Sequence, residues 1–215
     1  MDNEEAAALI IKNIAMIEEA NRLLQGDLSE KVFGAIDQTI QSWMDDLEGL
    51  EWVGSFDFWN SRWGTYFGPE QWRTGDEEAE HWIASFDLGA IGDDDGEEWL
   101  TALLAARRQR IGFRFSVDRS LLNVKIKAWR TFASEKNQEC PEIEQGGFQF
   151  EPREGTWFLP WQINADLLAE TYVNDAIEDA LDPLKEALER IHVVYPIFVE
   201  LVESAQQHFG VDQNA

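Results

Sequence analysis

Aromatic side chains constrain this chain more than any other feature. Its 215 residues include ten tryptophans and thirteen phenylalanines, and apolar residues make up 44% of the total. Chains that stay disordered are poor in aromatic residues because they bury little apolar surface. The length and the apolar fraction suit one folded domain with a real hydrophobic core. We therefore treat residues 1–215 as a single domain.

Negative charge is the second dominant feature, with 42 acidic residues against 17 lysines and arginines and a net charge of −25. Such a chain repels phosphate backbones and anionic membrane surfaces and attracts basic ones. We expect its partner to be a basic protein surface, such as that of a nucleic-acid-binding enzyme. We expect neither membrane binding nor direct binding of nucleic acid, and the composition leaves the oligomeric state open.

Several features predict a cytoplasmic protein. The single cysteine, Cys140, excludes a disulfide within the chain and gives no sign of an oxidising compartment. The first five residues lack the basic region of a signal peptide. No apolar run reaches the roughly 18 residues of a membrane span.

Hydrophobic periodicity predicts helices at both ends of the chain. Ile10, Ile14 and Ile17 recur at helical spacing before Gly26, and a second amphipathic helix follows, so we expect a helical hairpin over residues 1–49. Residues 164–210 also read as helices. Within them, Pro196 is expected to kink the last helix or restart it.

Between the helices, residues 50–163 alternate between apolar and polar positions, most clearly at 111–117, with helices interleaved. A last strand is expected near 157–163, where Pro160 favours a sheet edge or a bulge. Short turns between strands indicate antiparallel pairing. We predict an α+β fold in which one mostly antiparallel sheet of about four to six strands is packed by the helical hairpin and by long C-terminal helices.

No pattern in the chain identifies a catalytic site, a metal site or a cofactor. The acidic turn at 93–98 lacks the first carboxylate of a calcium-binding loop, and a solvated helix cap is the favoured reading. His81, His192 and His208 do not have zinc-binding spacing. Cys140 has no sequence partner that marks a nucleophile. We predict no catalytic residues and no cofactor.

Nine of the seventeen basic residues lie between 107 and 136, so residues 101–150 have a net charge of +4 within a strongly acidic chain. One interpretation is a nucleic-acid-binding patch. The favoured interpretation is internal neutralisation, because the surrounding acidic side chains should pair with these bases.

Two groups of residues are candidates for contact with a partner. Seven acids recur every three to five residues along 164–190 and should form a row on one side of the helices, with a second row at Asp37, Asp45, Asp46 and Glu48. Some tryptophans should be exposed, since Trp is enriched at binding hot spots. The predicted contact residues are Glu170, Asp175, Glu178, Asp179, Asp182, Glu186, Glu189, Trp59, Trp63 and Trp72.

The segment 110–115, followed after a helix by 157–161 and then by two acidic helices, resembles a known family. Residues 50–205 are similar to the non-catalytic C-terminal region of bacterial and phage proteins of the PD-(D/E)XK nuclease superfamily. That superfamily needs an aspartate and a Glu-x-Lys on adjoining strands. Because Glu151-Pro152-Arg153 has the spacing but offers arginine for lysine, no catalytic residue is carried over.

Three functions remain open on the sequence. The leading hypothesis is a non-catalytic acidic interaction protein, of the kind that phages and plasmids use to mimic nucleic acid and inhibit a bacterial defence system. The second is a nuclease-associated or degenerate nuclease domain in a defence setting. The third is an ordinary domain of a salt-adapted bacterium.

Overall fold

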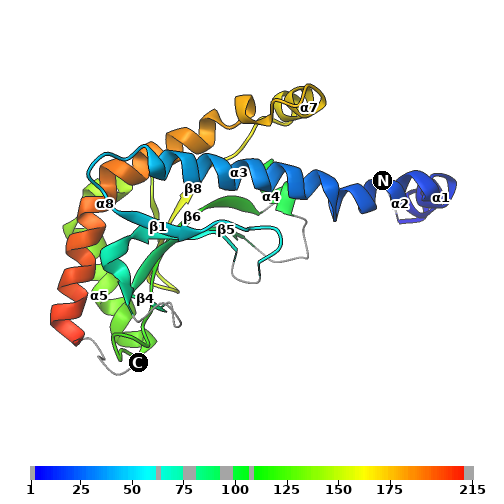
Figure 1. Cartoon of the computed structure of the whole chain (residues 1–215). Coiled ribbons are helices and arrows are strands. Elements are labelled where there is room, and N and C mark those ends of the chain that lie inside the picture. The colour runs from blue at the N-terminus through cyan, green and yellow to red at the C-terminus, as the bar shows by residue number, and fades with distance from the viewer. Residues whose placement is uncertain (1–2, 62–63, 75–80, 93–98, 107–108, 211–215) are drawn as a thin grey trace.

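The computed structural model describes residues 3–61, 64–74, 81–92, 99–106 and 109–210. Helices and strands alternate in the middle of the chain, between helical segments at each end (Figure 1). The helices are α1 (Asn3–Lys12), α2 (Ile14–Leu24), α3 (Asp27–Asp45), α4 (Trp99–Leu103), α5 (Ile126–Glu139), α6 (Pro141–Gln145), α7 (Ala165–Val173) and α8 (Asp182–Phe209), with 3-10 turns η1 (Glu70–Trp72) and η2 (Ile177–Ala180). The strands are β1 (Trp52–Ser55), β2 (Tyr66–Pro69), β3 (Arg73–Thr74), β4 (His81–Trp82), β5 (Ala84–Ile91), β6 (Arg110–Val117), β7 (Gln149–Glu151) and β8 (Thr156–Pro160).

Six strands form one antiparallel sheet in the order β1-β2-β5-β6-β8-β7, and β3 and β4 form a separate two-stranded sheet. The longest pairing joins β5 to β6 from Ala84 opposite Val117 to Ile91 opposite Arg110. The predicted α+β class and the mostly antiparallel sheet are confirmed. Of the two alternatives predicted from Pro160, a sheet edge or a bulge, the edge is wrong, because β8 lies between β6 and β7. Pro160 is the last residue of β8 and pairs with Gly112.

Alternation along the strands gives the sheet one apolar face and one mixed face. Phe67, Phe86, Phe113, Phe115 and Trp157 are all fully buried on the apolar face. Helices α3 and α8 lie on that side (Figure 1). Phe198 of α8 completes the core, since its ring stacks on Phe115 at 4.1 Å and contacts Phe86 at 5.5 Å.

The last helix, α8, runs for 28 residues with Pro196 inside it. A proline cannot donate to the carbonyl four residues earlier, and it crowds the preceding turn. The helix changes direction as it passes around the sheet (Figure 1) but does not restart. The sequence predicts that Pro196 either kinks the last helix or restarts it. The continuous helix excludes the restart.

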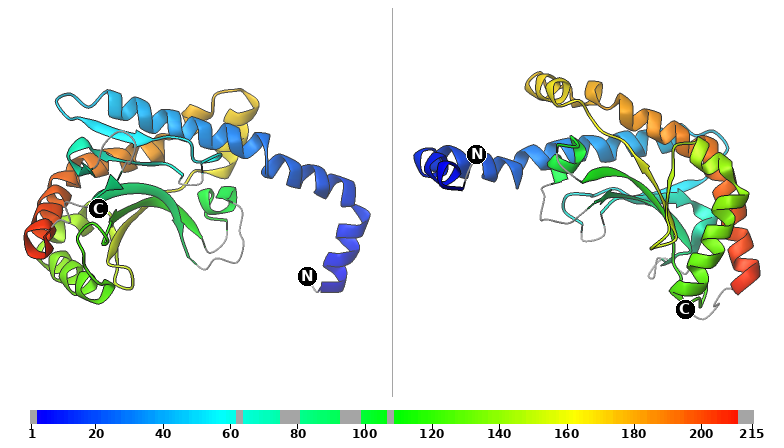
Figure 2. Two further views of the ribbon diagram at one scale, coloured as in Figure 1. Left: turned by 60° about the horizontal axis from the view of Figure 1, so that its bottom comes forward. Right: turned by 180° about the vertical axis from the view of Figure 1, so that it is seen from behind.

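The predicted pair of N-terminal helices is present, and its first helix is divided at Asn13 into α1 and α2. Only Gln25 and Gly26 separate α2 from α3. Helix α3 packs on the core through Val32, Phe33 and other apolar residues on the same side, whereas α2 has no buried residue. Helices α1 and α2 reach away from the sheet (Figure 2).

Candidate partner-binding surface

All seven acids predicted to contact a partner are exposed in the structure. They do not form one helical row, because the chain changes element twice between Glu170 and Glu189. Helix α7 ends at Val173, η2 covers 177–180, and α8 begins at Asp182. The expected continuous row is therefore wrong, although the side chains themselves face solvent.

Two of these seven acids already have basic partners. Asp175 pairs with Lys31 at 2.5 Å, and this hydrogen bond holds the pKa of the Asp175 carboxyl below its usual value. Asp182 pairs with Lys185 at 3.1 Å. Their charges are partly compensated within the chain, so they are less available to an external cation than the other five.

The second predicted row loses Asp37, which is buried rather than exposed. Its carboxylate accepts a hydrogen bond from the backbone N–H of Phe58 at 2.9 Å and another from the Thr65 hydroxyl. Burial raises the pKa of Asp37, while the Thr65 and Phe58 hydrogen bonds oppose that rise. Asp37 ties α3 to the segment between β1 and β2, which is a structural role. Asp45, Asp46 and Glu48 are exposed as predicted.

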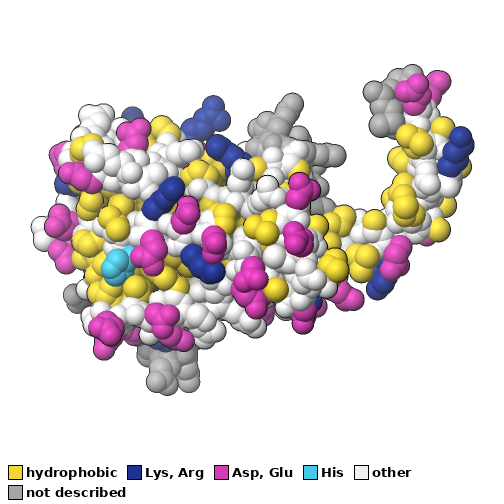
Figure 3. Space-filling view, turned by 90° about the horizontal axis from the view of Figure 1, so that it is seen from above, with side chains coloured by type: hydrophobic (Ala, Val, Ile, Leu, Met, Phe, Trp, Pro, Cys, Tyr) yellow, Lys and Arg dark blue, Asp and Glu magenta, His cyan; other side chains and the backbone are white. Residues whose placement is uncertain are grey.

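A groove of about 480 Å³ lies between α3 and α8. Trp43 and Asp46 line it from α3 and its C-terminal cap, and Glu178 and Glu189 line it from η2 and α8. We call this the acidic groove. Figure 3 views this side of the molecule, where acidic side chains are spread with apolar side chains between them.

Trp43 joins the two walls of the acidic groove, because its indole Nε1 on α3 donates a hydrogen bond to Glu189 Oε1 on α8 at 3.2 Å. Lys185 also lines the groove, but it pairs with Asp182 and reaches the Glu178 carbonyl oxygen at 3.4 Å. Asp46 caps the C-terminal end of α3, where the helix dipole contributes further negative potential. The groove therefore presents negative potential around an aromatic ring.

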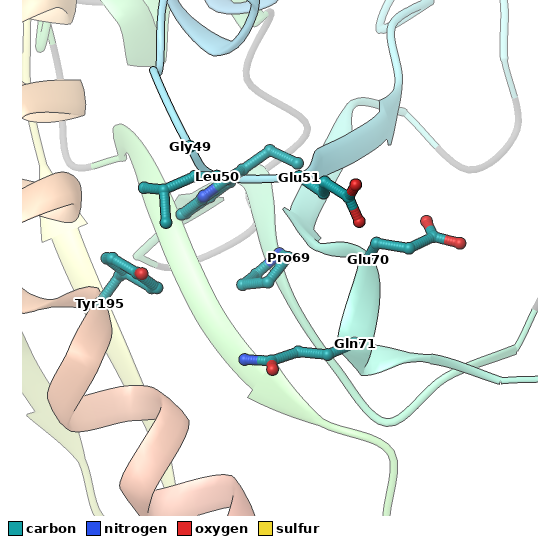
Figure 4. A pocket seen from close by; sticks show the side chains of 8 residues that line it. Gly49, Leu50, Glu51, Pro69, Glu70, Gln71 and Tyr195 are labelled. Carbon is teal, nitrogen blue, oxygen red and sulfur yellow. The ribbon is translucent and has the colours of Figure 1, made fainter.

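A second hollow, of about 670 Å³, opens beside β1 and is lined by residues 49–52, 69–71 and Tyr195. The Glu51 and Glu70 side chains point the same way in Figure 4, and Tyr195 lies across the hollow from them. Trp52 Nε1 and Glu70 Oε2 are buried there without a hydrogen-bond partner among the described residues, while Glu70 Oε1 lies 3.7 Å from Arg73 Nη1 in an ion pair. A bound group could accept a hydrogen bond from Trp52 Nε1 and donate one to Glu70 Oε2.

The two hollows are adjacent through a pair of tryptophans. Trp43 lines the acidic groove and Trp52 lines the second hollow, and the two rings meet edge to face with centroids 5.5 Å apart. Tyr195 packs edge to face on Trp52 at 5.4 Å. Carboxylates therefore lie on both sides of an aromatic cluster in which Trp52 is buried and Trp43 and Tyr195 are half-buried. Carboxylates and half-exposed rings are groups that bind basic side chains.

The three tryptophans predicted to contact a partner lie elsewhere. Trp72 is 2% exposed and packs against Phe86 and Phe115, so it belongs to the core and is not available to a partner. Trp59 is half-buried and stacks on Phe33 at 6.1 Å, away from the acidic groove. Trp63 lies outside the described residues, as does the acidic turn at 93–98.

Among the bases of this segment that the structure describes, the expected internal pairing is found for Lys136 and for none of the others. Lys136 pairs with Glu139 at 2.8 Å. No ion pair joins a described carboxylate to any of six other bases, which are Arg110, Arg114, Arg119, Lys125, Lys127 and Arg130. All except Arg114 are exposed, so positive charge reaches the surface near the start of α5. Arg107 and Arg108 lie outside the described residues.

Arg114 belongs to a polar cluster on the mixed face of the sheet, where it lies directly opposite Asp87 in the β5–β6 register. Asp87 accepts hydrogen bonds from the hydroxyls of Ser85 at 2.7 Å and Ser116 at 2.6 Å. Burial raises the pKa of Asp87, and Ser116, Ser85 and the Arg114 charge oppose that rise. Both carboxylate oxygens have partners, so this cluster is a complete structural network.

The histidines and the cysteine do not cluster into a metal site in the described part of the chain. No group of three or more His, Cys, Asp or Glu side chains there is arranged to hold a metal ion. Cys140 is half-buried between α5 and α6, and burial raises the pKa of its thiol although Lys136 acts against the rise. A thiol of raised pKa is a weak nucleophile near neutral pH.

Sequence reasoning missed Trp43, Glu51 and Glu70 as candidate contact residues. Trp43 occupies an apolar position of an amphipathic helix, which predicts a core residue. Its partial exposure depends on how α8 crosses α3. Glu51 and Glu70 are 19 positions apart, and only the pairing of β1 with β2 brings them together. No local pattern in the chain carries this information.

In comparisons with known proteins, no family model, no curated protein and no solved structure matches the chain. The resemblance to the nuclease superfamily therefore stays a prediction. None of the described helices combines the length and the apolar character that crossing a bilayer requires. The function has to be inferred from the side chains on the surface.

Proposed function

We propose that this protein acts by contact, and that its acidic groove binds a basic segment of a partner protein. The observation that carries the proposal is the arrangement of Asp46, Glu178 and Glu189 around the Trp43 indole. Carboxylates bind ammonium and guanidinium groups through charge-assisted hydrogen bonds. An indole face adds a cation–π contact of about 0.5–2 kcal/mol.

The dimensions support recognition of individual side chains. A volume of about 480 Å³ accommodates the end of a lysine or arginine together with part of its backbone. The second hollow, with Glu51 and Glu70, provides room for a further basic side chain. The net charge of −25 would steer a basic partner toward the molecule before contact.

Nucleic-acid-binding proteins present basic surfaces of this kind, and we propose them as the partner class. DNA carries one charge per ~1.7 Å of axis, counted over both strands. The acids between Glu170 and Glu189 are divided among three elements and are sparser than that. A few basic side chains held in the acidic groove and the adjoining hollow are better supported than imitation of a long phosphate row.

A charge-matched pair of variants tests the proposal. The groove variant carries Asp46→Asn, Glu178→Gln and Glu189→Gln. The control variant carries Glu142→Gln, Glu200→Gln and Glu203→Gln, which are three exposed acids of α6 and α8 outside the groove lining. Both variants change the net charge by the same amount. The probe is a fluorescein-labelled nona-arginine peptide, whose affinity is measured by fluorescence anisotropy at about 0.15 M salt.

We expect the groove variant to bind the peptide about tenfold more weakly than the control, which corresponds to about 1.4 kcal/mol. The Trp43 indole N–H signal in a proton–nitrogen NMR spectrum should shift on titration with the unchanged protein. Equal losses in the two variants, together with an unmoved Trp43 signal, would show that the peptide senses only the overall charge and would refute the groove as a site.

A further inference from the structure

The most exposed apolar surface of the described chain lies on α1 and α2. Of the eleven large hydrophobic side chains that are strongly exposed among the described residues, seven belong to these two helices. Their exposed fractions run from 37% to 74%, in the set Leu9, Ile10, Ile11, Ile14, Met16, Ile17 and Leu23. Contiguous apolar surface of this kind marks an interaction site.

These side chains follow a seven-residue period. Pairs of apolar residues stand at Leu9-Ile10, Met16-Ile17 and Leu23-Leu24. Apolar residues that recur every seven residues stay on one side of a helix, and helices that pair lengthwise bury such a stripe. In this chain the repeated residues are adjacent pairs, so they form a broad apolar stripe and not the narrow a and d seam of a regular coiled coil. The pattern therefore indicates that a second helix covers this face.

The described part of the chain supplies no such helix. Helix α2 has no buried residue, and α1 and α2 extend beyond the sheet (Figures 2 and 3). We call residues 3–24 the arm. Apart from Leu24, which packs partly buried against the core, its described side chains lie outside the core, whose first buried residues are Ser29 and Val32 of α3.

We infer that the arm binds the arm of a second copy of this chain, with the two helices antiparallel. The repeat is compatible with itself, since an antiparallel pair centred between Met16 and Ile17 brings Ile10 opposite Leu23 of the second copy. Such a contact is isologous, so one surface provides both sides of it.

The size of the arm fits a stable dimer. Residues 3–24 span roughly 30 Å if counted at the helical rise per residue. Two arms that cover the large apolar side chains other than Ile11, which are Leu9, Ile10, Ile14, Met16, Ile17 and Leu23, would bury much of the roughly 800 Å² per partner of a stable interface. This inference concerns a different surface from the acidic groove and does not depend on the proposed function.

Charge selects the antiparallel orientation. Residues 1–26 carry five acids and two bases, a net charge of −3, which leaves −22 on the remaining 189 residues. A parallel pair would set these two acidic bodies side by side. An antiparallel pair places them at opposite ends of the arms, about three Debye lengths apart or more at physiological salt.

The arm bends between α1 and α2 (Figure 2), at Asn13, although helical hydrogen bonds continue across it from Asn13 N–H to Leu9 and from Ile17 N–H to Asn13. The first apolar pair lies on one side of the bend and the other two pairs on α2. Helix α2 therefore forms the centre of the contact, where Met16 and Ile17 meet the symmetry axis.

Mass measurement and one matched pair of variants test the dimer. Sedimentation velocity of the full chain should give twice the 24.7 kDa chain mass at micromolar concentration. Ile17→Glu places a carboxylate in the repeat and should weaken dimerisation at least about a hundredfold, since each dimer buries the new charge twice. Ile11→Glu, 74% exposed and outside the repeat, should leave the dimer intact. Circular dichroism should show that both variants remain folded.

Cysteine cross-linking in a Cys140→Ser background tests the orientation. Met16→Cys lies near the axis and should form an intermolecular disulfide, whereas Leu23→Cys should not do so unless it is mixed with an Ile10→Cys chain. A disulfide formed by Leu23→Cys alone would overturn the antiparallel arrangement. A chain that still sediments as a monomer at about 100 µM would overturn the inference that a second copy covers the arm. Its dimer would then have a dissociation constant above about 100 µM, too weak for a specific dimer.

Discussion

The Trp43 indole on α3 donates a hydrogen bond to the Glu189 carboxylate on α8, which lies 146 positions later in the sequence. This contact joins the first helix of the core to the last one, and it sets a carboxylate against an aromatic ring at the wall of the acidic groove. The groove exists because these two helices cross on the same face of the sheet.

Replacing Trp43 by phenylalanine separates the hydrogen bond from the packing. The ring stays apolar, but Glu189 loses its donor, so Trp43→Phe should cost about 0.5–1.5 kcal/mol in the free energy of unfolding. Affinity for the nona-arginine peptide should fall several-fold because Glu189 is no longer held in place. Urea denaturation and anisotropy measure the two effects, and an unchanged affinity would mean that the bond has only a structural role.

Reversing charges along η2 and α8 should weaken partner binding without loss of fold. In the variant Glu178→Lys, Asp179→Lys and Glu186→Lys, the affinity for a basic partner should drop and its salt dependence should flatten. The thermal midpoint should hold or rise, because like charges at this spacing repel each other. The same reversal at Glu142, Glu200 and Glu203 is the control. If both variants bind alike, the acidity serves solubility only.

Asp37 should be far more sensitive to substitution than the exposed acids of α3. Asp37→Ala leaves the Phe58 N–H and the Thr65 hydroxyl without their acceptor, so we expect a loss of about 1–3 kcal/mol. Asp37→Asn keeps one acceptor oxygen and should lose less. Asp45→Ala, on the exposed side of the helix, should change stability by less than about 0.5 kcal/mol. Equal effects at positions 37 and 45 would contradict the assigned hydrogen bonds.

Asp87 should make stability depend on pH in a definite direction. Because burial raises its pKa in the folded state, the folded chain holds this proton more tightly than the unfolded chain. The contribution of protonated Asp87 to the free energy of unfolding is complete below the ordinary aspartate pKa of about 3.9. It is lost as the pH rises through the pKa of Asp87 in the folded chain.

The comparison with Asp87→Asn isolates this effect. The stability of the unchanged chain minus that of the variant should fall as the pH rises above about 4. Ser116→Ala removes one hydroxyl that stabilises the ionised form, so it should steepen the fall. A difference that grows with pH would show that Arg114 and the two serines outweigh the desolvation.

The sequence predicts the parts of the fold that depend on local pattern. Alternation at 111–117 indicates β6, and helical spacing indicates α3 and α8. It does not predict which acids are buried, because Asp37 and Asp45 both lie on one amphipathic helix and only the contact with Phe58 and Thr65 distinguishes them. The sequence also predicts internal acidic partners for the bases between 107 and 136, and among the described residues the structure shows no ion pair for six of them. Total charge predicts that acids are available, but it does not predict which ones lie within reach of Arg119 or Lys125.

The continuity of α8 through Pro196 has a consequence for evolution and engineering of this surface. Glu189 and Tyr195 line the two hollows, and Phe198 lies among the aromatic rings of the core less than one turn beyond Tyr195. Helix α8 therefore carries both residues that line the proposed binding surface and residues that form the core. A substitution that repacks Phe198 will move the walls of the groove, so specificity at this site can drift through residues that no partner ever touches.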